Sequence, residues 1–256
     1  MKFVVFASDY VGKEVVKIFE QANHPICGLI LDAKDKGNFN KEIIDIFSRQ
    51  NFNSPILYSD AVYDQESLLM IQNINPDLML LAWWSYIIKP SLIQIPRLGV
   101  LNFHPSYLPH NRGKHYNFWT LVEETPFGVT IHWVDEGVDS GEIAFQELIE
   151  KDWEDTGETL YYKAQEKILK LFKDNFETIR KGEIPRTPQD FAQGSFHKAS
   201  ELAEASHIDL DKEYQAKDLL NLLRAKTFPP HPAAWFIDEE GNKFEVCVKI
   251  SRCDKE

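Results

Sequence analysis

The amino-acid sequence predicts an α/β protein with a mostly parallel sheet and flanking helices, followed by a small C-terminal module of one helix and a β-hairpin. Short apolar runs alternate with amphipathic stretches through the first hundred residues, which is the pattern of βαβ units around a buried parallel sheet. The chain has 256 residues, 43% of them hydrophobic, so it is long enough for one large core and an appendage. After residue 206 the pattern changes to a short helical segment and two strand-like runs.

The elements of the sheet region are expected in a regular order. Residues 2–7 form a first apolar strand, and residues 12–22 form a helix because their apolar side chains recur at helical spacing. A second buried run follows at residues 26–31, a weaker helix covers residues 41–50, and a long helix covers residues 159–180. The other strands are expected at residues 54–58, 78–82, 99–103 and 128–133, the last alternating Val129, Ile131 and Trp133 with Thr130 and His132.

The second half of the chain contains a segment without period. Residues 181–206 gain Gly, Pro and polar residues, which is typical of a connection that crosses the surface. A short helix is expected at residues 217–224, followed by prolines and by strand-like runs at 233–237 and 243–250. The pattern therefore predicts a main domain of residues 1–181, a connecting segment of residues 182–206 and a C-terminal module of residues 207–256.

The final hairpin predicts a homodimer. Phe244, Val246, Val248 and Ile250 alternate with charged residues, so one face of this strand must be buried. An isolated two-stranded hairpin is marginal in water and needs a partner. That partner is either the parent domain or the same hairpin of a second chain.

Composition restricts the partners and the compartment. The formal charge of -12 opposes a broad nucleic-acid surface, whereas a few local cations suffice for an acidic small molecule. The first apolar run is too short for a signal-peptide core or a membrane span. Cys27, Cys247 and Cys253 are odd in number and lack metal-ligand spacing, as expected for free thiols in a reducing compartment. We therefore expect a cytoplasmic protein without nucleic-acid or membrane partners.

Two common enzyme classes lack their motifs here. The loop after the first strand, residues 8–12, does not contain the spaced glycines of a dinucleotide fingerprint, which opposes nicotinamide or flavin binding there. A hydrolase is unsupported as well, because the sequence shows neither a Gly-X-Ser-X-Gly elbow nor a metal-spaced His/Asp cluster.

The residues best suited to chemistry follow the strand at 99–103. Asn102 and His104 are two positions apart on an extended segment, so both side chains point to the same side of the sheet. An Asn amide can donate to the oxyanion of an acyl transfer, and a His can accept a proton from an attacking amine. Asp139 can orient that His, because the glycines of its loop, residues 135–141, permit tight turns. Turn or core roles remain open for all three residues.

Four motifs resemble the folate-dependent formyltransferase family. They are Asn-Phe-His-Pro-Ser-Tyr-Leu-Pro at residues 102–109, Asn-Arg-Gly at 111–113, Gly-Val-Thr-Ile-His at 128–132 and Asp-Glu-Gly-Val-Asp-Ser-Gly at 135–141. The resemblance implies a Rossmann-like catalytic domain and a catalytic trio of Asn102, His104 and Asp139. It also implies N10-formyltetrahydrofolate as co-substrate and no metal.

The same resemblance implies where the two substrates bind. Residues 80–88 look like the family's folate hinge, which places Ser85, Tyr86 and Ile88 near the pterin, together with Asp135, Gly137 and Val138 of the loop. Plain core packing for residues 80–88 and an ordinary turn role for Asp135 remain alternatives. The acceptor side would include Ser8, Arg112, Gly113, His115, Arg224 and Phe228. For Arg224 and Phe228 the alternative is a helix end and its core packing.

Three branches of the family take different acceptors: glycinamide ribonucleotide, methionyl-tRNA and nucleotide-linked amino sugars. The acidic chain disfavours tRNA, and the chain continues some seventy residues past Arg180, whereas the purine enzymes usually end near the long helix. Residues 218–230 look like the C-terminal module of the sugar enzymes. The resemblance thus implies an amino deoxysugar carried on dTDP, with UDP and GDP open, for surface polysaccharide such as the O-antigen of lipopolysaccharide. A catalytically inactive folate or sugar-nucleotide binding module is the non-enzyme alternative.

Overall fold

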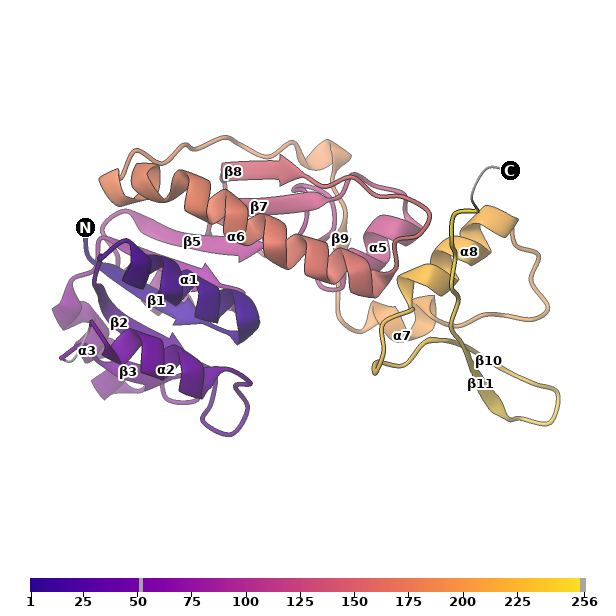
Figure 1. Ribbon diagram of the computed structural model, residues 1–256, viewed down its shortest axis with the longest axis horizontal. Helices are drawn as coiled ribbons and strands as arrows, with labels where there is room; N and C mark the ends of the chain where they lie inside the picture. The colour runs from indigo at the N-terminus through magenta and orange to yellow at the C-terminus, as the bar shows by residue number, and fades with distance from the viewer. Residues whose placement is uncertain (51–52, 254–256) are drawn as a thin grey trace. The chain divides into compact units, whose positions relative to one another are not determined.

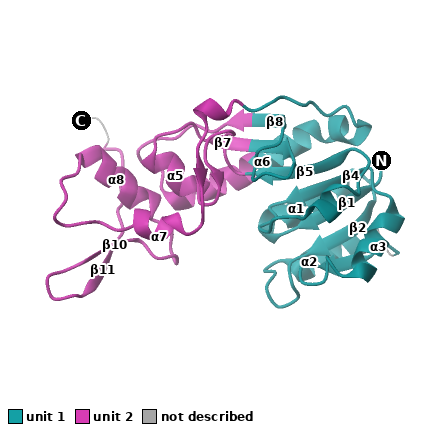
Figure 2. Ribbon diagram, turned by 180° about the vertical axis from the view of Figure 1, so that it is seen from behind, with its two compact units in different colours: residues 1–104, 130–146, 168–189 teal, residues 105–129, 147–167, 190–256 magenta. Residues whose placement is uncertain are grey.

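A computed structural model describes residues 1–50 and 53–253, and its elements are labelled in Figure 1. The chain forms two compact units, coloured separately in Figure 2. Unit 1 contains residues 1–104, 130–146 and 168–189, and unit 2 contains residues 105–129, 147–167 and those from Asp190 onward. The predicted connecting segment is thus divided between the units at residues 189 and 190. The last three residues of the predicted C-terminal module lie outside the described residues.

Unit 1 is built on a seven-stranded sheet of order β3-β2-β1-β4-β5-β7-β8. The pairs β3–β2, β2–β1, β1–β4 and β4–β5 are parallel, and β5–β7 is antiparallel. This confirms the α/β, Rossmann-like class with a mostly parallel sheet. The strands are β1 (Phe3–Ala7), β2 (Ile26–Leu31), β3 (Ile56–Tyr58), β4 (Leu78–Ala82), β5 (Gly99–His104), β7 (Gly128–Trp133) and β8 (Ile143–Leu148).

The helices that flank this sheet are α1 (Asp9–Gln21), α2 (Asn40–Ser48), α3 (Gln65–Ile74), α4 (Pro90–Ile93) and α6 (Gly157–Lys181). The structure also contains elements that the sequence did not predict. Helix α1 begins three residues before the predicted start at residue 12. Helix α3 was not predicted because only Ser67 and Ile71 of its residues are buried, which leaves a weak helical period. Strand β8 was missed because most of its residues are partly exposed.

The two faces of the sheet are covered by different side chains. Phe103 of β5 packs against Phe172 of α6, which also contacts Phe19 of α1. On the opposite face an apolar cluster joins strand residues such as Met79 and Val100 to Ile71 of α3, Leu92 of α4 and Ile88. Because side chains alternate along a strand, Val100, Asn102 and His104 all point to this second face. The apolar cluster therefore ends where the polar side chains of β5 begin.

Unit 2 consists of short elements, of which α8 packs against α5. Helix α8 confirms the helix predicted at residues 217–224. The predicted strand at 243–250 is shorter than expected and ends at Val246. Two positions further, the same register would place Val248 opposite Pro232, which has no N–H to donate. The elements are β6 (Arg112–Gly113), α5 (Tyr116–Val122), η1 (Phe191–Gln193), β9 (Phe196–His197), α7 (Glu201–Ala205), α8 (Ala216–Ala225), β10 (Ala234–Ile237) and β11 (Lys243–Val246). Among the described residues, no helix is both long and apolar enough to cross a membrane.

Candidate active site

Four polar side chains lie together on one face of the sheet. The antiparallel register pairs Asn102 of β5 with His132 of β7, and His104 with Thr130. Residues two apart on a strand share a face, so these cross-strand pairs form a square. All residues of β7 are buried, including Thr130 and His132, which makes the two polar side chains exceptional there. The sequence-based expectation that Asn102 and His104 point the same way is confirmed.

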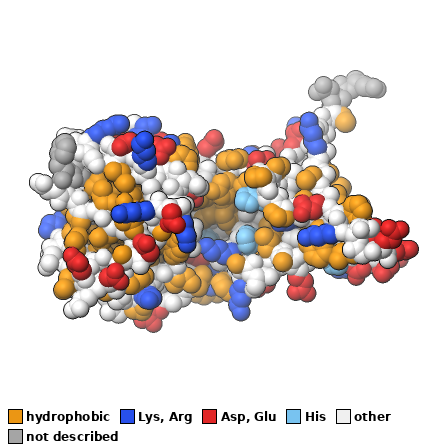
Figure 3. Space-filling view, turned by 90° about the horizontal axis from the view of Figure 1, so that it is seen from below, with side chains coloured by type: hydrophobic (Ala, Val, Ile, Leu, Met, Phe, Trp, Pro, Cys, Tyr) orange, Lys and Arg blue, Asp and Glu red, His pale blue; other side chains and the backbone are white. Residues whose placement is uncertain are grey.

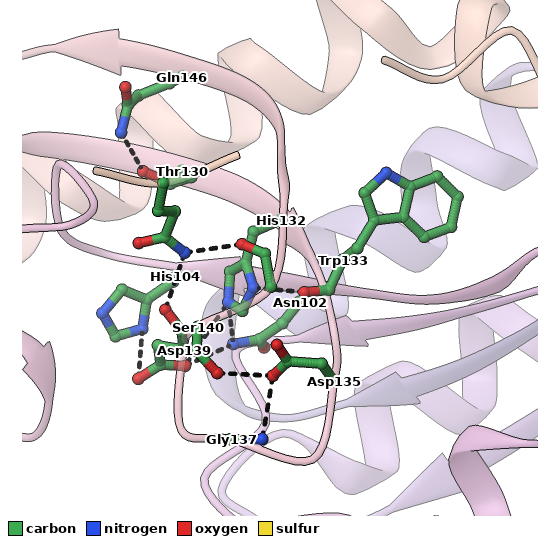
Figure 4. Close-up of polar contacts among 12 residues, drawn as sticks. Asn102, His104, Thr130, His132, Trp133, Asp135, Gly137, Asp139, Ser140 and Gln146 are labelled. Carbon is green, nitrogen blue, oxygen red and sulfur yellow. Dashed lines mark hydrogen bonds and ion pairs between the residues drawn. The ribbon is translucent and has the colours of Figure 1, made fainter. Parts of the chain in front are cut away.

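Asp139 completes this group from the loop that follows β7, as Figure 4 shows. Its Oδ2 lies 3.5 Å from Nδ1 of His104, and its Oδ1 lies 3.5 Å from Nε2 of His132. The amide nitrogen of Asn102 is 3.4 Å from the same Oδ1. The three residues predicted to be catalytic are therefore neighbours, with His104 only 4% exposed. The Asp139 carboxylate therefore lies between the two imidazole rings.

His132 was not predicted as a site residue, and its tautomer orients Asn102. Nδ1 of His132 lies 2.8 Å from the carbonyl oxygen of Trp133, which can only accept, so Nδ1 carries the hydrogen. In the neutral ring Nε2 is then an acceptor, 3.2 Å from the amide nitrogen of Asn102. If the carboxamide of Asn102 were flipped, its oxygen would face two acceptors, Nε2 of His132 and the Asp139 carboxylate. The network therefore fixes which atom of the carboxamide faces the carboxylate.

The loop that carries Asp139, residues 135–141, owes its shape to a different cause than the sequence predicted. Asp139 itself has the left-handed φ of 50°, whereas neither Gly137 nor Gly141 does. Gly141 is required for space, because a Cβ there would lie 1.8 Å from the Trp133 carbonyl oxygen, whereas a Cβ on Gly137 would first meet the Ser140 hydroxyl, at 2.0 Å, which is the movable end of a side chain. The expectation of glycine turns is thus corrected to close approach at Gly141.

Asp135 braces the same loop from within. Its Oδ1 accepts hydrogen bonds from the Gly137 amide at 3.0 Å and from the Ser140 hydroxyl at 2.6 Å. These contacts match an ordinary turn role for Asp135, which is the alternative to folate contact. Val138, between Gly137 and Asp139, is 38% exposed and so can contact a ligand.

The segment predicted to contact folate leaves the carboxyl end of β4. Ser85 and Tyr86 are exposed, whereas Ile88 is buried in the apolar cluster under α4. The Tyr86 ring packs edge-on against Trp84 at 5.3 Å, so it has a supported position at the surface. Ser85 and Tyr86 are thus accessible to a ligand, and Ile88 has a core role.

Ser8 lies at the carboxyl end of β1 but is nearly inaccessible. Its side chain is 2% exposed, and its hydroxyl oxygen makes no hydrogen bond with the described residues. Burial raises the pKa of Asp32 at the end of β2, and the nearby Ser8 hydroxyl partly opposes this shift. The structure therefore buries Ser8 within unit 1.

In unit 2, the predicted acceptor residues Arg112, Gly113 and His115 lie before and at the start of α5. The Arg112 guanidinium stacks 4.7 Å from the Phe191 ring centre. Gly113 has a φ of 91°, and a Cβ there would lie 2.2 Å from the His197 carbonyl oxygen, so it serves the backbone of the β6–β9 pair. Burial, with smaller contributions from Lys226 and Lys114, lowers the pKa of His115. His115 is thus a neutral imidazole near two cations.

Arg224 has the contacts of a structural residue. It is 8% exposed, and its guanidinium donates to the Asn221 oxygen at 2.9 Å and to the carbonyl oxygens of Asp152 at 2.6 Å and Asp155 at 3.2 Å. These bonds match the helix-end alternative for Arg224. Phe228 packs against the Tyr161 ring at 5.3 Å, within the same unit.

Replacing Arg224 with methionine is expected to lower the free energy of unfolding by about 2 to 3 kcal/mol, because two buried carbonyl oxygens lose a charged donor. Urea unfolding measures this loss. R224K keeps the charge without the planar fork and should recover only part of it. A methionine variant of full stability with a raised KM for an anionic substrate would instead assign Arg224 to binding.

No group of three or more His, Cys, Asp or Glu side chains within residues 1–50 and 53–253 is placed to hold a metal ion. Four side chains on this face of the sheet supply an amide donor, two imidazoles and a carboxylate. Such a set can stabilise an oxyanion and move a proton.

Comparisons with known proteins agree with this chemistry. Residues 1–174 match the model of the family described as Formyl transferase, and residues 201–252 match that of the N-formyltransferase dimerization C-terminal domain. A methionyl-tRNA formyltransferase of Methylacidiphilum infernorum (isolate V4) is 31% identical over 196 residues, which are 76% of this chain and 57% of that protein. The chain thus spans little more than half the length of this relative.

Solved structures share the fold along nearly the whole chain. A 4-N formyltransferase from Francisella tularensis superposes with a TM-score of 0.81 at 24% identity, covering 98% of both chains. The formyltransferase PseJ from Anoxybacillus kamchatkensis, in complex with UDP-4,6-dideoxy-4-formamido-L-AltNAc and tetrahydrofolate, has a TM-score of 0.59 at 25% identity. That match covers 88% of this chain and 99% of PseJ.

Proposed function

The chain belongs to the formyl transferase family, and we propose that it transfers the formyl group of N10-formyltetrahydrofolate to the amine of a nucleotide-linked amino deoxysugar. The observation that carries this proposal is the cluster of Asn102 and His104 on β5 with Asp139 on the loop after β7, in which Asp139 lies 3.4 Å from Asn102 and 3.5 Å from His104. Amide, imidazole and carboxylate are the groups that formyl transfer to an amine requires.

In the proposed reaction a bond forms between the sugar nitrogen and the formyl carbon, and the bond from that carbon to N10 breaks. Asn102 donates to the oxygen that becomes negative, since its 3.4 Å contact with Asp139 is long and its N–H can turn to a better acceptor. His104 accepts the proton that the amine loses and returns it to the departing nitrogen. Asp139, beside Nδ1 of His104, stabilises the imidazolium in between.

The residues present fit a folate co-substrate. Two large apolar side chains are exposed on the segment after β4, the strand next to β5: Tyr86 is 47% exposed and Ile87 is 79% exposed. A flat pterin ring would cover such side chains. We propose that Ser85, Tyr86 and Val138 contact it.

Two features favour a nucleotide sugar over tRNA as the acceptor. The formal charge of -12 disfavours a polyanion, and residues 201–252 match a domain named for N-formyltransferases. PseJ, which covers most of this chain, binds a UDP-linked formamido sugar. The proposed acceptor is therefore an amino deoxysugar on thymidine or uridine diphosphate.

A side-by-side assay of acceptors tests the proposal. The protein is expected to formylate a dTDP- or UDP-linked 3-amino or 4-amino deoxysugar, and to leave methionyl-tRNA and glycinamide ribonucleotide unchanged. Transfer is measured as formation of tetrahydrofolate and as the mass increase of the acceptor. Efficient formylation of methionyl-tRNA, with the sugars inert, would assign the chain to that other branch.

We also propose a cytoplasmic homodimer that supplies formamido sugars for surface polysaccharide such as O-antigen. Cys27, Cys247 and Cys253 are free thiols, which suits a reducing compartment. The C-terminal match to a dimerization domain supports the dimer. So does the hairpin, where Ile237 and Phe244 are 47% and 46% exposed although both are large and apolar.

The contact between two such hairpins would run along their strands. Acidic side chains gather over the hairpin turn, at the right-hand end of Figure 3, where Asp238, Glu239 and Glu240 lie. Two turns brought together would therefore repel each other. Phe236 and Phe244 lie opposite each other in the paired strands instead, so their rings share one face of the hairpin and stack at 5.3 Å.

Replacing Phe236 and Phe244 together with glutamate is expected to give a folded monomer, because the two residues share one face of the hairpin and four charges would then enter a two-fold apolar contact. Light scattering after gel filtration should show the mass halve. The matched control is L210E, which changes an exposed apolar residue of unit 2 outside the hairpin and should remain dimeric. A wild-type protein that is monomeric at micromolar concentration would contradict the dimer.

A further inference from the structure

Residues 183–189, here called the strap, lie outside the helical pattern yet pack against the loop that carries Asp139. Thr187 exchanges two backbone hydrogen bonds with Ile143, at 2.8 and 2.9 Å. The indole nitrogen of Trp133 donates to the Pro185 carbonyl oxygen at 2.9 Å. Trp133 precedes the loop and Ile143 follows it, so the strap is joined to the chain at both ends of the loop.

Arg186 strengthens this attachment. Its guanidinium lies 3.7 Å from the Trp133 ring centre and donates to the Glu142 carboxylate at 3.0 Å. A second donor of Arg186 reaches the Leu98 carbonyl oxygen at 3.2 Å. The strap is therefore fixed to the sheet itself, independently of the loop between Trp133 and Glu142.

From this fixed position Gln189 holds the loop. Its amide nitrogen donates to the Asp139 carbonyl oxygen at 2.9 Å and to the Gly141 carbonyl oxygen at 2.7 Å. One side chain thus uses both of its N–H groups on the two residues around the catalytic turn. Asp139 has a left-handed φ of 50°, a conformation that costs a non-glycine residue about 1 kcal/mol or more and persists only when its surroundings fix it.

We propose that Gln189 is a positioning residue: by holding the backbone of Asp139 and Gly141, it keeps the Asp139 carboxylate against His104. This inference rests on the proposed function for its effect on turnover, but its effect on His104 is measurable without substrate. The Asp139 carboxylate is 3.5 Å from His104, so a shift of about 1 Å changes both the orientation of the ring and the stabilisation of its protonated form.

The test uses Gln189→Met, which keeps the length of the side chain and removes both donors, and Gln189→Asn, which is too short to reach both carbonyl oxygens. Titration of His104 is followed by NMR of histidine-labelled full-length protein. Two titratable groups face His104, Asp139 from the loop and His132 from β7. With the carboxylate displaced, the midpoint of His104 should move to lower pH in both variants, because the protonated ring loses its counter-charge.

Turnover supplies the second measurement. Both variants should lower kcat by about 10- to 100-fold with KM values close to wild type, because misplacement of a catalytic group affects the transition state. Gln193 is the matched control, since its side chain donates to the exposed Asp190 carboxylate at 3.1 Å and not to the loop, and Gln193→Met should change neither quantity.

A His104 midpoint and a kcat that stay at wild-type values in folded Gln189→Met and Gln189→Asn would overturn the positioning role. If one variant fails to fold, the other decides. A wild-type protein inactive with every formyl acceptor would overturn the proposed function instead, and the His104 titration would still test Gln189 separately.

Discussion

Asn102→Ala is expected to lower kcat by about 10²- to 10³-fold while the binding of both substrates stays within a few-fold of wild type. In the proposed reaction the amide donates to an oxygen whose negative charge exists only near the transition state, so loss of the amide falls on the chemical step. His132 loses one hydrogen-bond donor in this variant, since its Nε2 accepts from Asn102 at 3.2 Å. Steady-state kinetics with saturating co-substrate measure kcat, and calorimetric titration measures binding.

The matched control is Asn175→Ala. Asn175 donates to the Leu171 carbonyl oxygen on α6 at 2.8 Å, in the same unit and far along the chain from the site. It should keep wild-type kcat. An Asn102→Ala enzyme with kcat within about threefold of wild type would remove Asn102 from the transition state. His104→Ala should behave like Asn102→Ala if both act in one network, and the double variant should then lose less than the sum.

The sequence predicted much of the site because strand periodicity carries geometry. A spacing of two positions on an extended segment was enough to place Asn102 and His104 on one side of the sheet. Asp139 was a candidate because the glycines of its loop permit tight turns, and the family resemblance then assigned it to the trio. No local rule says that a loop folds back over two particular side chains. Its distance from His104, 3.5 Å, emerges only in the folded unit.

The sequence also contains a signal for His132, namely a polar side chain on an otherwise apolar strand. The strand at residues 128–133 was predicted with Thr130 and His132 on its alternate face, and its residues proved buried throughout. Polar side chains on a strand buried on both faces need polar partners. The register that supplies those partners, Asn102 with His132, depends on the antiparallel pairing of β5 and β7, which their separation along the chain does not reveal.

Long-range contacts explain the remaining differences. The strap has no period because Pro185, Arg186, Thr187 and Gln189 each contact a different part of the sheet or loop. A segment of this kind resembles a linker in sequence, although residues up to 189 belong to unit 1. The units themselves are discontinuous, with β7 and β8 crossing from one to the other, and no boundary along the chain could describe them.

Gly141→Ala is expected to lower kcat by about 100-fold and the free energy of unfolding by about 1 to 3 kcal/mol. The added Cβ would lie 1.8 Å from the Trp133 carbonyl oxygen, a backbone atom of the buried strand β7 that cannot yield. The loop must therefore move, and it carries both the Asp139 carboxylate and the two carbonyl oxygens that Gln189 holds.

Gly241 is the control that separates crowding from backbone conformation. Its φ is 85°, so alanine is strained there, yet a Cβ would meet nothing within 4 Å. Gly241→Ala should therefore lose about 1 kcal/mol of stability, measured by urea unfolding, and keep its kcat. Gly141→Ala has the opposite combination, ordinary φ and no space, so its loss of kcat must come from displacement of the loop. Full activity in Gly141→Ala would show that the Asp139 carboxylate can leave its place beside His104 without slowing formyl transfer.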